Sequence, residues 1–211
     1  MLWMYAVCAL SMFICLPFFL YYKYAWRMKL AAAFKTLGTL CAACLALTAA
    51  IRLEPHYWIC FAALFLHAIA DCILEFNMYI GTGFFIAGHI CYISFFAHLC
   101  PVGSIHLIAA LCLLGVMVFL LWRWRKPIGK SLPFIAVYGT VLSLAAACAI
   151  ACFTLHTFQG QLIAIGGALF FISDVMILAR LLFSAGRSVD WAIMITYYAA
   201  QLLFGISCLL G

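Results

Sequence analysis

Residues 64–96 read LFLHAIADCILEFNMYIGTGFFIAGHICYISFF, two apolar runs joined by the short segment NMYIGTG at 77–83. The runs predict two helices, and the glycines of the joining segment predict a tight reversal between them. On the first helix His67, Asp71 and Glu75 recur every four residues, so they form one stripe that drifts slowly around the axis. Ionisable groups in an apolar helix are costly unless they face a protein interior or a water-filled cavity. This stretch therefore predicts a functional site.

The composition of the chain limits it to one class of protein. Of 211 residues, 71% are hydrophobic and 8% are charged, and the mean hydropathy is +1.27. A water-soluble globular domain has an apolar share nearer half, so we expect a polytopic membrane protein. Eight apolar runs are each long enough to cross ~30 Å of hydrocarbon as helix, at about 2–22, 31–51, 57–79, 82–100, 104–122, 132–153, 160–183 and 189–210. We predict an all-α transmembrane helix bundle that forms a single domain over residues 1–211.

Basic residues gather on alternate loops between these runs. Ten of the eleven lysines and arginines fall on the odd-numbered loops, and only Arg52 falls on the opposite side. The positive-inside rule then places the odd-numbered loops in the cytoplasm and both termini on the other side. This topology accounts for the net charge of +6, which gives no reason to infer nucleic-acid binding. The expected location is the cytoplasmic membrane of a prokaryote or the endoplasmic reticulum membrane.

The seventh and eighth runs carry a second set of polar residues. GALFFISDVMIL in the seventh run contains Asp174, and the eighth run holds Tyr197, Tyr198 and Gln201 in an apolar setting. Aligning ISDV around Asp174 with IADC around Asp71 pairs the third run with the seventh and the fourth with the eighth. Four runs separate the two copies, an even number, so the alignment suggests a weak parallel repeat of the two halves, 1–103 and 104–211.

The unusual residues of four runs lie at similar depths. At 1.5 Å per residue, Asp71, Asp174 and His89 lie about 12, 15 and 10 Å from the cytoplasmic ends of their helices. Tyr198 and Gln201 lie about 13 to 18 Å from theirs by the same rule. A random scatter of polar residues would seldom agree so well. We therefore expect one slab of polar side chains in the cytoplasmic half of the membrane.

Other conspicuous residues are given less specific interpretations. Lys35 lies about one turn inside the second run, where it can snorkel to water or meet a lipid phosphate, and we favour snorkelling. Tyr138, near the start of the sixth run, is interpreted as a tyrosine satisfied at the membrane interface. The twelve cysteines, including Cys41 and Cys44, lack the polar neighbours of a thiolate or metal site, so we interpret them as packing residues.

This set of residues resembles the lysoplasmalogenase family of eight-span membrane proteins, also called YhhN-like. That family typically shows an acid in the middle of the third span, followed by the motifs G-x-x-x-F-x-x-A-H-x-x-Y, G-A-x-x-F-x-x-S-D and Y-x-x-A-Q. The corresponding residues are Asp71, Gly81, Phe85, Gly88, His89, Tyr92, Gly167, Ala168, Phe171, Ser173, Asp174, Tyr197, Tyr198, Ala200 and Gln201. Lys35 is similar to the family's lysine at the start of the second span. The departures, at Thr36, Ala70, Gly88 and Phe171, concern packing more than chemistry.

The resemblance implies hydrolysis of the vinyl ether bond of a lysoplasmalogen to a fatty aldehyde and a glycerophosphoethanolamine or glycerophosphocholine. The expected partners are therefore a lysophospholipid substrate and bilayer lipid, with no cofactor and no metal. An enol ether is cleaved by protonating carbon and adding water to the resulting oxocarbenium ion, which requires a proton donor and an anion.

Candidate roles follow from that chemistry. Asp71 and Asp174 are the expected coupled pair, one the acid and the other the stabiliser and water-activating base, in either order. His89 is expected to orient the acid or to carry the proton. The expected substrate-binding residues are Lys35, Glu75, Tyr92, Tyr198 and Gln201.

Two other functions are compatible with the sequence. A metal hydrolase would use His67, Asp71 and His89 as three zinc ligands, although neither HxxxH nor HExxH occurs, and metal analysis would distinguish it. A small proton- or cation-coupled transporter would use the two intramembrane acids as ion sites. No run has the Gly or Pro interruption at the midplane that a broken transporter helix needs, and substrate turnover in detergent would favour the enzyme.

Overall fold

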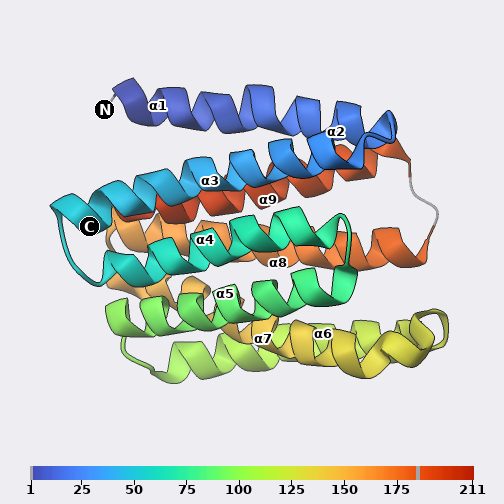
Figure 1. Cartoon of the computed structure of the whole chain (residues 1–211). Coiled ribbons are helices and arrows are strands. Elements are labelled where there is room, and N and C mark those ends of the chain that lie inside the picture. The colour runs from blue at the N-terminus through green and yellow to red at the C-terminus, as the bar shows by residue number, and fades with distance from the viewer. Residues whose placement is uncertain (1, 184–185) are drawn as a thin grey trace.

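The chain forms a bundle of helices that lie side by side and alternate in direction, as the computed structural model of residues 2–183 and 186–211 shows (Figure 1). The α-helices are α1 (Leu2–Ala9), α2 (Leu16–Tyr24), α3 (Met28–Arg52), α4 (Tyr57–Leu74), α5 (Met78–Leu99), α6 (Ser104–Ile128), α7 (Leu132–Ala151), α8 (Phe158–Leu182) and α9 (Arg187–Ser207). A π-helical segment, Leu10–Cys15, joins α1 to α2, and 3-10 turns at Gly129–Ser131 and Cys152–Leu155 flank α7. No strand occurs in the described residues, which confirms the predicted all-α class.

Seven helical segments of the described chain are long and apolar enough to cross a membrane. One of them, Ser104–Leu155, is 52 residues long and contains both α6 and α7, which fold back along each other (Figure 1). The difference from the predicted eight spans arises at this hairpin. Several apolar helices support the predicted integral membrane protein, whereas the eight spans and the external termini stay predictions.

The reversal between α4 and α5 forms differently from the prediction. Gly81 and Gly83 lie inside α5, and the turn itself consists of residues 75–77. The Asn77 side chain caps α5 by accepting a hydrogen bond of 3.1 Å from the Ile80 backbone N–H. Gly81 serves close packing instead, because a Cβ there would lie 2.7 Å from the Cα of Leu74. The glycine therefore brings the start of α5 directly against the end of α4.

Small residues determine how closely α3 and α9 approach each other. A Cβ at Gly205 of α9 would lie 2.5 Å from the Ala42 carbonyl oxygen of α3. A Cβ at Gly38 of α3 would likewise lie 2.5 Å from the Tyr198 ring of α9. Glycine and alanine allow such contacts between helix backbones in membrane proteins. The close contact lets side chains of both helices reach one shared interior.

Gly205→Ala is expected to destabilise the protein by about 1–3 kcal/mol, because the added methyl group overlaps the Ala42 carbonyl. Gly83→Ala is the matched control, since a Cβ at this exposed position of α5 meets no atom within 4 Å. Helix propensity alone predicts that the control gains about 0.5–1 kcal/mol. Thermal unfolding of both variants in detergent measures the difference, and equal stabilities would contradict the close packing of α3 and α9.

Candidate active site

A cavity of about 350 Å³ lies at the end of the bundle where α4 and α8 finish and α5 and α9 begin. Each helix from α2 to α9 contributes to its wall, which is mostly apolar. The ionisable residues of the wall are the acids Asp71, Glu75, Asp174 and Asp190 and the bases Lys23, Lys35 and Arg180. This is the end of the bundle that the sequence predicts to face the cytoplasm, and two residues of the expected polar slab, Asp71 and Asp174, line the cavity.

Asp71 of α4 is fully buried, and its two carboxylate oxygens have different surroundings. Its Oδ2 accepts hydrogen bonds from Thr39 Oγ1 at 2.5 Å and from Tyr197 OH at 2.8 Å. Its Oδ1 is buried without a hydrogen-bond partner among the described residues, and Lys35 Nζ lies 3.5 Å from it. The protein thus holds one oxygen by two hydrogen bonds, whereas the other has the Lys35 ammonium as its neighbouring cation.

Asp174 of α8 lies on the same cavity and has a simpler environment. Its Oδ2 accepts a hydrogen bond from Tyr138 OH of α7. No lysine, arginine or histidine nitrogen lies within 4.0 Å of its carboxyl group in the described parts of the chain. The two aspartates therefore share a cavity, but only Asp71 is paired with a cation.

Lys35 of α3 is only 7% exposed, which overturns the expectation that it snorkels to water. Its Nζ lies 3.1 Å from Glu75 Oε1 and 3.5 Å from Asp71 Oδ1, so two carboxylates compensate the buried ammonium. Lys23 approaches the same Glu75 oxygen at 4.0 Å. Burial raises the pKa of the Glu75 carboxyl, but Lys35 and Lys23 outweigh burial and hold that pKa below its ordinary value.

A second ion pair, between α8 and α9, also lines the cavity. Arg180 Nε of α8 donates to Asp190 Oδ1 of α9 at 3.0 Å. Asp190 Oδ2 accepts a hydrogen bond from Tyr24 OH of α2 at 3.1 Å. The carboxylate of Asp190 thereby connects the ends of three helices around the mouth of the cavity.

A buried chain of hydrogen bonds extends behind Asp71. Tyr197 OH, which donates to Asp71, accepts from Gln201 Nε2 at 3.0 Å. Gln201 Oε1 accepts from Tyr92 OH at 2.7 Å, and Gln201 Nε2 lies 3.2 Å from His67 Nδ1. Gln201 therefore fixes Tyr197, and through it the orientation of the Asp71 carboxylate.

His89 forms the far end of this chain. Its Nδ1 donates to the Phe85 carbonyl oxygen at 2.7 Å and lies 3.2 Å from His67 Nε2. Gly88 allows the two imidazoles to meet, because a Cβ there would lie 2.7 Å from the His67 ring. His89 is buried and does not line the 350 Å³ cavity, so it lies in a supporting layer and not on the cavity surface.

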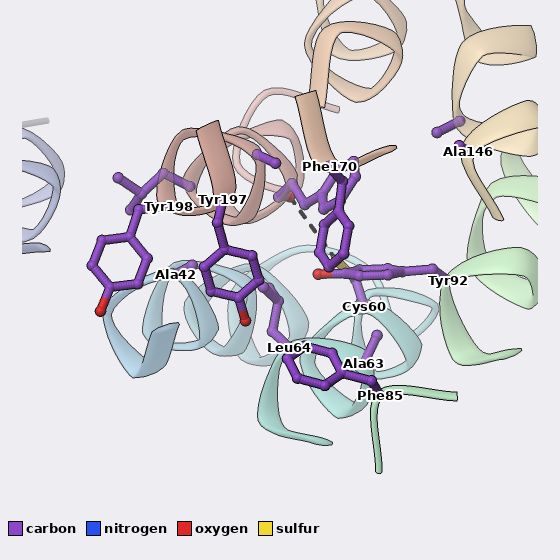
Figure 2. Packing of buried hydrophobic residues seen from close by; sticks show 14 of the residues in the cluster. Ala42, Cys60, Ala63, Leu64, Phe85, Tyr92, Ala146, Phe170, Tyr197 and Tyr198 are labelled. Atoms are coloured by element: carbon purple, nitrogen blue, oxygen red, sulfur yellow. Dashed lines mark hydrogen bonds between the residues drawn. The ribbon is translucent and has the colours of Figure 1, made fainter. Parts of the chain in front are cut away.

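The neighbouring tyrosines of α9 have rings that lie side by side, with centroids 5.7 Å apart, but their hydroxyl groups have different partners (Figure 2). Tyr197 lines the cavity and donates to Asp71. Tyr198 packs against Gly38 of α3, and its hydroxyl donates to the Lys35 carbonyl oxygen at 3.0 Å. Tyr198 thus connects α9 to α3 through the backbone next to the site.

The cavity brings together half of the residues predicted from sequence. Asp71, Asp174, Lys35 and Glu75 line it, whereas His89, Tyr92, Tyr198 and Gln201 lie behind its wall. Three residues that contact the aspartates were not assigned to the site by the sequence analysis: Thr39, Tyr138 and Tyr197. Thr39 lies four residues after Lys35, so helical spacing was the available signal for it. Tyr197 was matched to the motif Y-x-x-A-Q without being given a role in the site.

The three zinc ligands of the metal alternative do not form one site. His67 and His89 contact each other, but the Asp71 carboxylate faces Thr39, Tyr197 and Lys35 instead. Across residues 2–183 and 186–211, no group of three His, Cys, Asp or Glu side chains is placed to hold a metal ion. The geometry of the described chain therefore does not support a zinc hydrolase.

Comparison with models of protein families gives a match over most of the chain. The model of the YhhN family matches residues 30–208. This range includes every residue that lines the cavity except those of α2. No curated protein and no solved structure matches the chain.

Proposed function

Since the chain belongs to the YhhN family, which includes lysoplasmalogenases, we propose that it is a membrane hydrolase that cleaves the vinyl ether bond of lysoplasmalogens. The products are a fatty aldehyde and a glycerophosphoethanolamine or glycerophosphocholine. The observation that carries the proposal is that two buried aspartates from distant parts of the sequence, Asp71 and Asp174, line one mostly apolar cavity. The proposed topology has eight spans with both termini outside, so the cavity opens to the cytoplasmic side.

The surroundings of the two carboxyl groups favour different roles. Asp71 accepts two hydroxyl hydrogen bonds and has the Lys35 ammonium 3.5 Å away, and all three contacts stabilise a negative charge. Asp174 has one tyrosine hydroxyl, an apolar setting and no basic partner within 4.0 Å in the described chain. We assign Asp174 as the proton donor and Asp71 as the anion that stabilises the cationic intermediate.

The reaction then balances with these two groups and one water. Asp174 gives its proton to the alkene carbon that is not bonded to oxygen, forming an oxocarbenium ion. Water adds to the carbon bonded to oxygen and returns a proton to Asp174, which restores the acid and gives a hemiacetal. The hemiacetal hydroxyl proton moves to the glycerol oxygen as the carbon–oxygen bond breaks, releasing the aldehyde. Asp71 stays ionised throughout, and its negative charge at the cavity wall stabilises the cation.

The purified protein in detergent is expected to release aldehyde from a vinyl ether lysolipid and none from the alkyl ether analogue of the same headgroup and chain. The alkyl ether has no double bond to protonate, so it forms no oxocarbenium ion by this route. Aldehyde is measured by coupled oxidation. No ion gradient exists in detergent, so release of aldehyde indicates hydrolysis and not transport. Absence of aldehyde from several vinyl ether lysolipids would falsify the proposed activity.

A further inference from the structure

We propose that Arg180 and Lys23 form a phosphate-binding subsite at the mouth of the cavity, which holds the phosphodiester of the lysolipid headgroup. This inference rests on the proposed function and adds a specific contact to it. Both side chains line the cavity, Arg180 from α8 and Lys23 from α2, and both are about two-fifths exposed, at 39% and 41%. They are the accessible cations of a site whose third base, Lys35, is buried.

Arg180 is held in one orientation with most of its donors unused. Its Nε donates to Asp190, and Asp190 in turn accepts from Tyr24 OH. The other four N–H groups of the guanidinium have no hydrogen-bond partner among the described residues. A planar guanidinium with free terminal donors matches two phosphate oxygens, and anchoring at Nε lowers the entropy lost on binding.

Of the two lysines that line the cavity, Lys23 has the weaker contact with a carboxylate. It approaches Glu75 Oε1 only at 4.0 Å, whereas Lys35 holds the same oxygen at 3.1 Å. Its ammonium therefore keeps donors for a ligand between α2 and α8. Lys35 is engaged by Glu75 and Asp71, so it serves the chemistry of Asp71 and not the headgroup.

The formal charge of the cavity favours a phosphodiester that carries an amine. In the proposed resting state Asp174 is protonated, so the three basic side chains face three carboxylates, Asp71, Glu75 and Asp190. This lining has no net formal charge, and a zwitterionic headgroup preserves that balance. The second oxygen of Glu75 has no hydrogen bond in the described structure and is available to an ammonium group.

The spacing along α8 fits the length of the substrate. Arg180 lies six positions after Asp174 along α8, a rise of about 9 Å. Seven bonds connect the phosphorus of a lysoplasmalogen to the alkene carbon that is protonated, about 9 Å at about 1.25 Å per bond. A phosphate at Arg180 therefore places that carbon at the depth of Asp174.

The test measures binding of non-hydrolysable alkyl ether lipids by purified wild type and Arg180→Ala. The variant is expected to bind the alkyl ether lysophosphocholine about 10- to 100-fold more weakly and the phosphate-free alkylglycerol equally well. Arg125→Ala, which changes an arginine at the same end of the bundle that does not line the cavity, is the matched control and should bind both lipids like wild type. In Arg180→Ala the Asp190 carboxylate loses its ion-pair partner. The double variant Arg180→Ala/Asp190→Asn removes that charge as well, and it should show the same weaker binding of the lysophosphocholine and unchanged binding of the alkylglycerol.

Several results would overturn the inference. An equal loss for both lipids would mean a general structural defect, and no loss for the lysophosphocholine would remove Arg180 from the subsite. If millimolar inorganic phosphate displaced the bound lysophosphocholine as effectively as a second lipid does, the site would be assigned to free phosphate. Because binding is measured without turnover, these outcomes are distinct from failure of the proposed function, which shows as absence of aldehyde from wild type with vinyl ether substrates.

Discussion

Asp174→Asn is expected to lower kcat for vinyl ether hydrolysis by about 10²- to 10⁴-fold, the usual contribution of a general acid. The amide has nearly the same shape and can still accept the hydrogen bond from Tyr138, but it has no acidic proton for the alkene carbon. Steady-state kinetics with a choline lysoplasmalogen measure the loss, and thermal unfolding in detergent verifies the fold. Glu54→Gln, at an exposed acid between α3 and α4, is the matched control and is expected to keep wild-type activity.

The pH dependence of the residual rate distinguishes the two aspartates. Without its acid, Asp174→Asn takes protons from hydronium, so its rate should rise about tenfold for each unit of decrease in pH. Asp71→Asn keeps the acid and loses the stabilising anion, so its kcat falls without that slope. If Asp71→Asn showed the pH slope and Asp174→Asn did not, Asp71 would be the proton donor and Asp174 the stabilising anion. Wild-type activity in Asp174→Asn would eliminate the aspartate pair mechanism altogether.

Lys35→Met is expected to destabilise the folded protein by about 3–5 kcal/mol, as when one partner of a buried ion pair is removed. The variant leaves Asp71 without its cation at 3.5 Å and leaves Glu75 with only the more distant Lys23 at 4.0 Å. Chemical unfolding in detergent measures this loss. Activity should fall as well, because the proposed anionic role of Asp71 depends on the neighbouring ammonium.

Two further variants test whether the destabilisation comes from the lost ion pairs of Lys35 or simply from removing a lysine of α3. Lys29→Met removes an exposed lysine of the same helix and is expected to change stability by no more than about 0.5 kcal/mol. Lys35→Met/Glu75→Gln also removes one of the uncompensated charges and should recover part of the stability. If Lys35→Met were as stable as Lys29→Met, the ion pairs of Lys35 would have no structural importance.

Isolated charges in apolar helices are conspicuous in the sequence, and they led to the prediction of two residues that line the candidate site, Asp71 and Asp174. Asp71 and Asp174 were predicted because a carboxyl group within a membrane span is costly unless it faces an interior. Their similar depth followed from the constant rise of a helix, which needs no knowledge of packing. The structure brings both to one cavity, together with Lys35 and Glu75.

Contacts between helices were less accessible to sequence analysis. Tyr138 resembles an ordinary interfacial tyrosine until α7 is placed beside α8 and its hydroxyl reaches Asp174. Lys35 has a side chain long enough to reach water, and only the position of the end of α4 shows that Glu75 and Asp71 hold it inside. The reversal after α4 lies at residues 75–77, before the glycines of the predicted segment, and Gly81 serves the contact with Leu74 instead of the turn.

The amino-acid sequence by itself determined the helical class, the apolar spans and the two acids at a common depth, because hydrophobicity and helical rise are local properties. The tertiary structure alone decided which side chains face the cavity. Tyr197 and Tyr198 are adjacent and chemically identical, yet one donates to Asp71 and the other to the backbone of α3. Successive residues on a helix point about 100° apart. The rotation of α9 that separates their roles is set by contacts with α3, where Gly38 and Ala42 meet Tyr198 and Gly205.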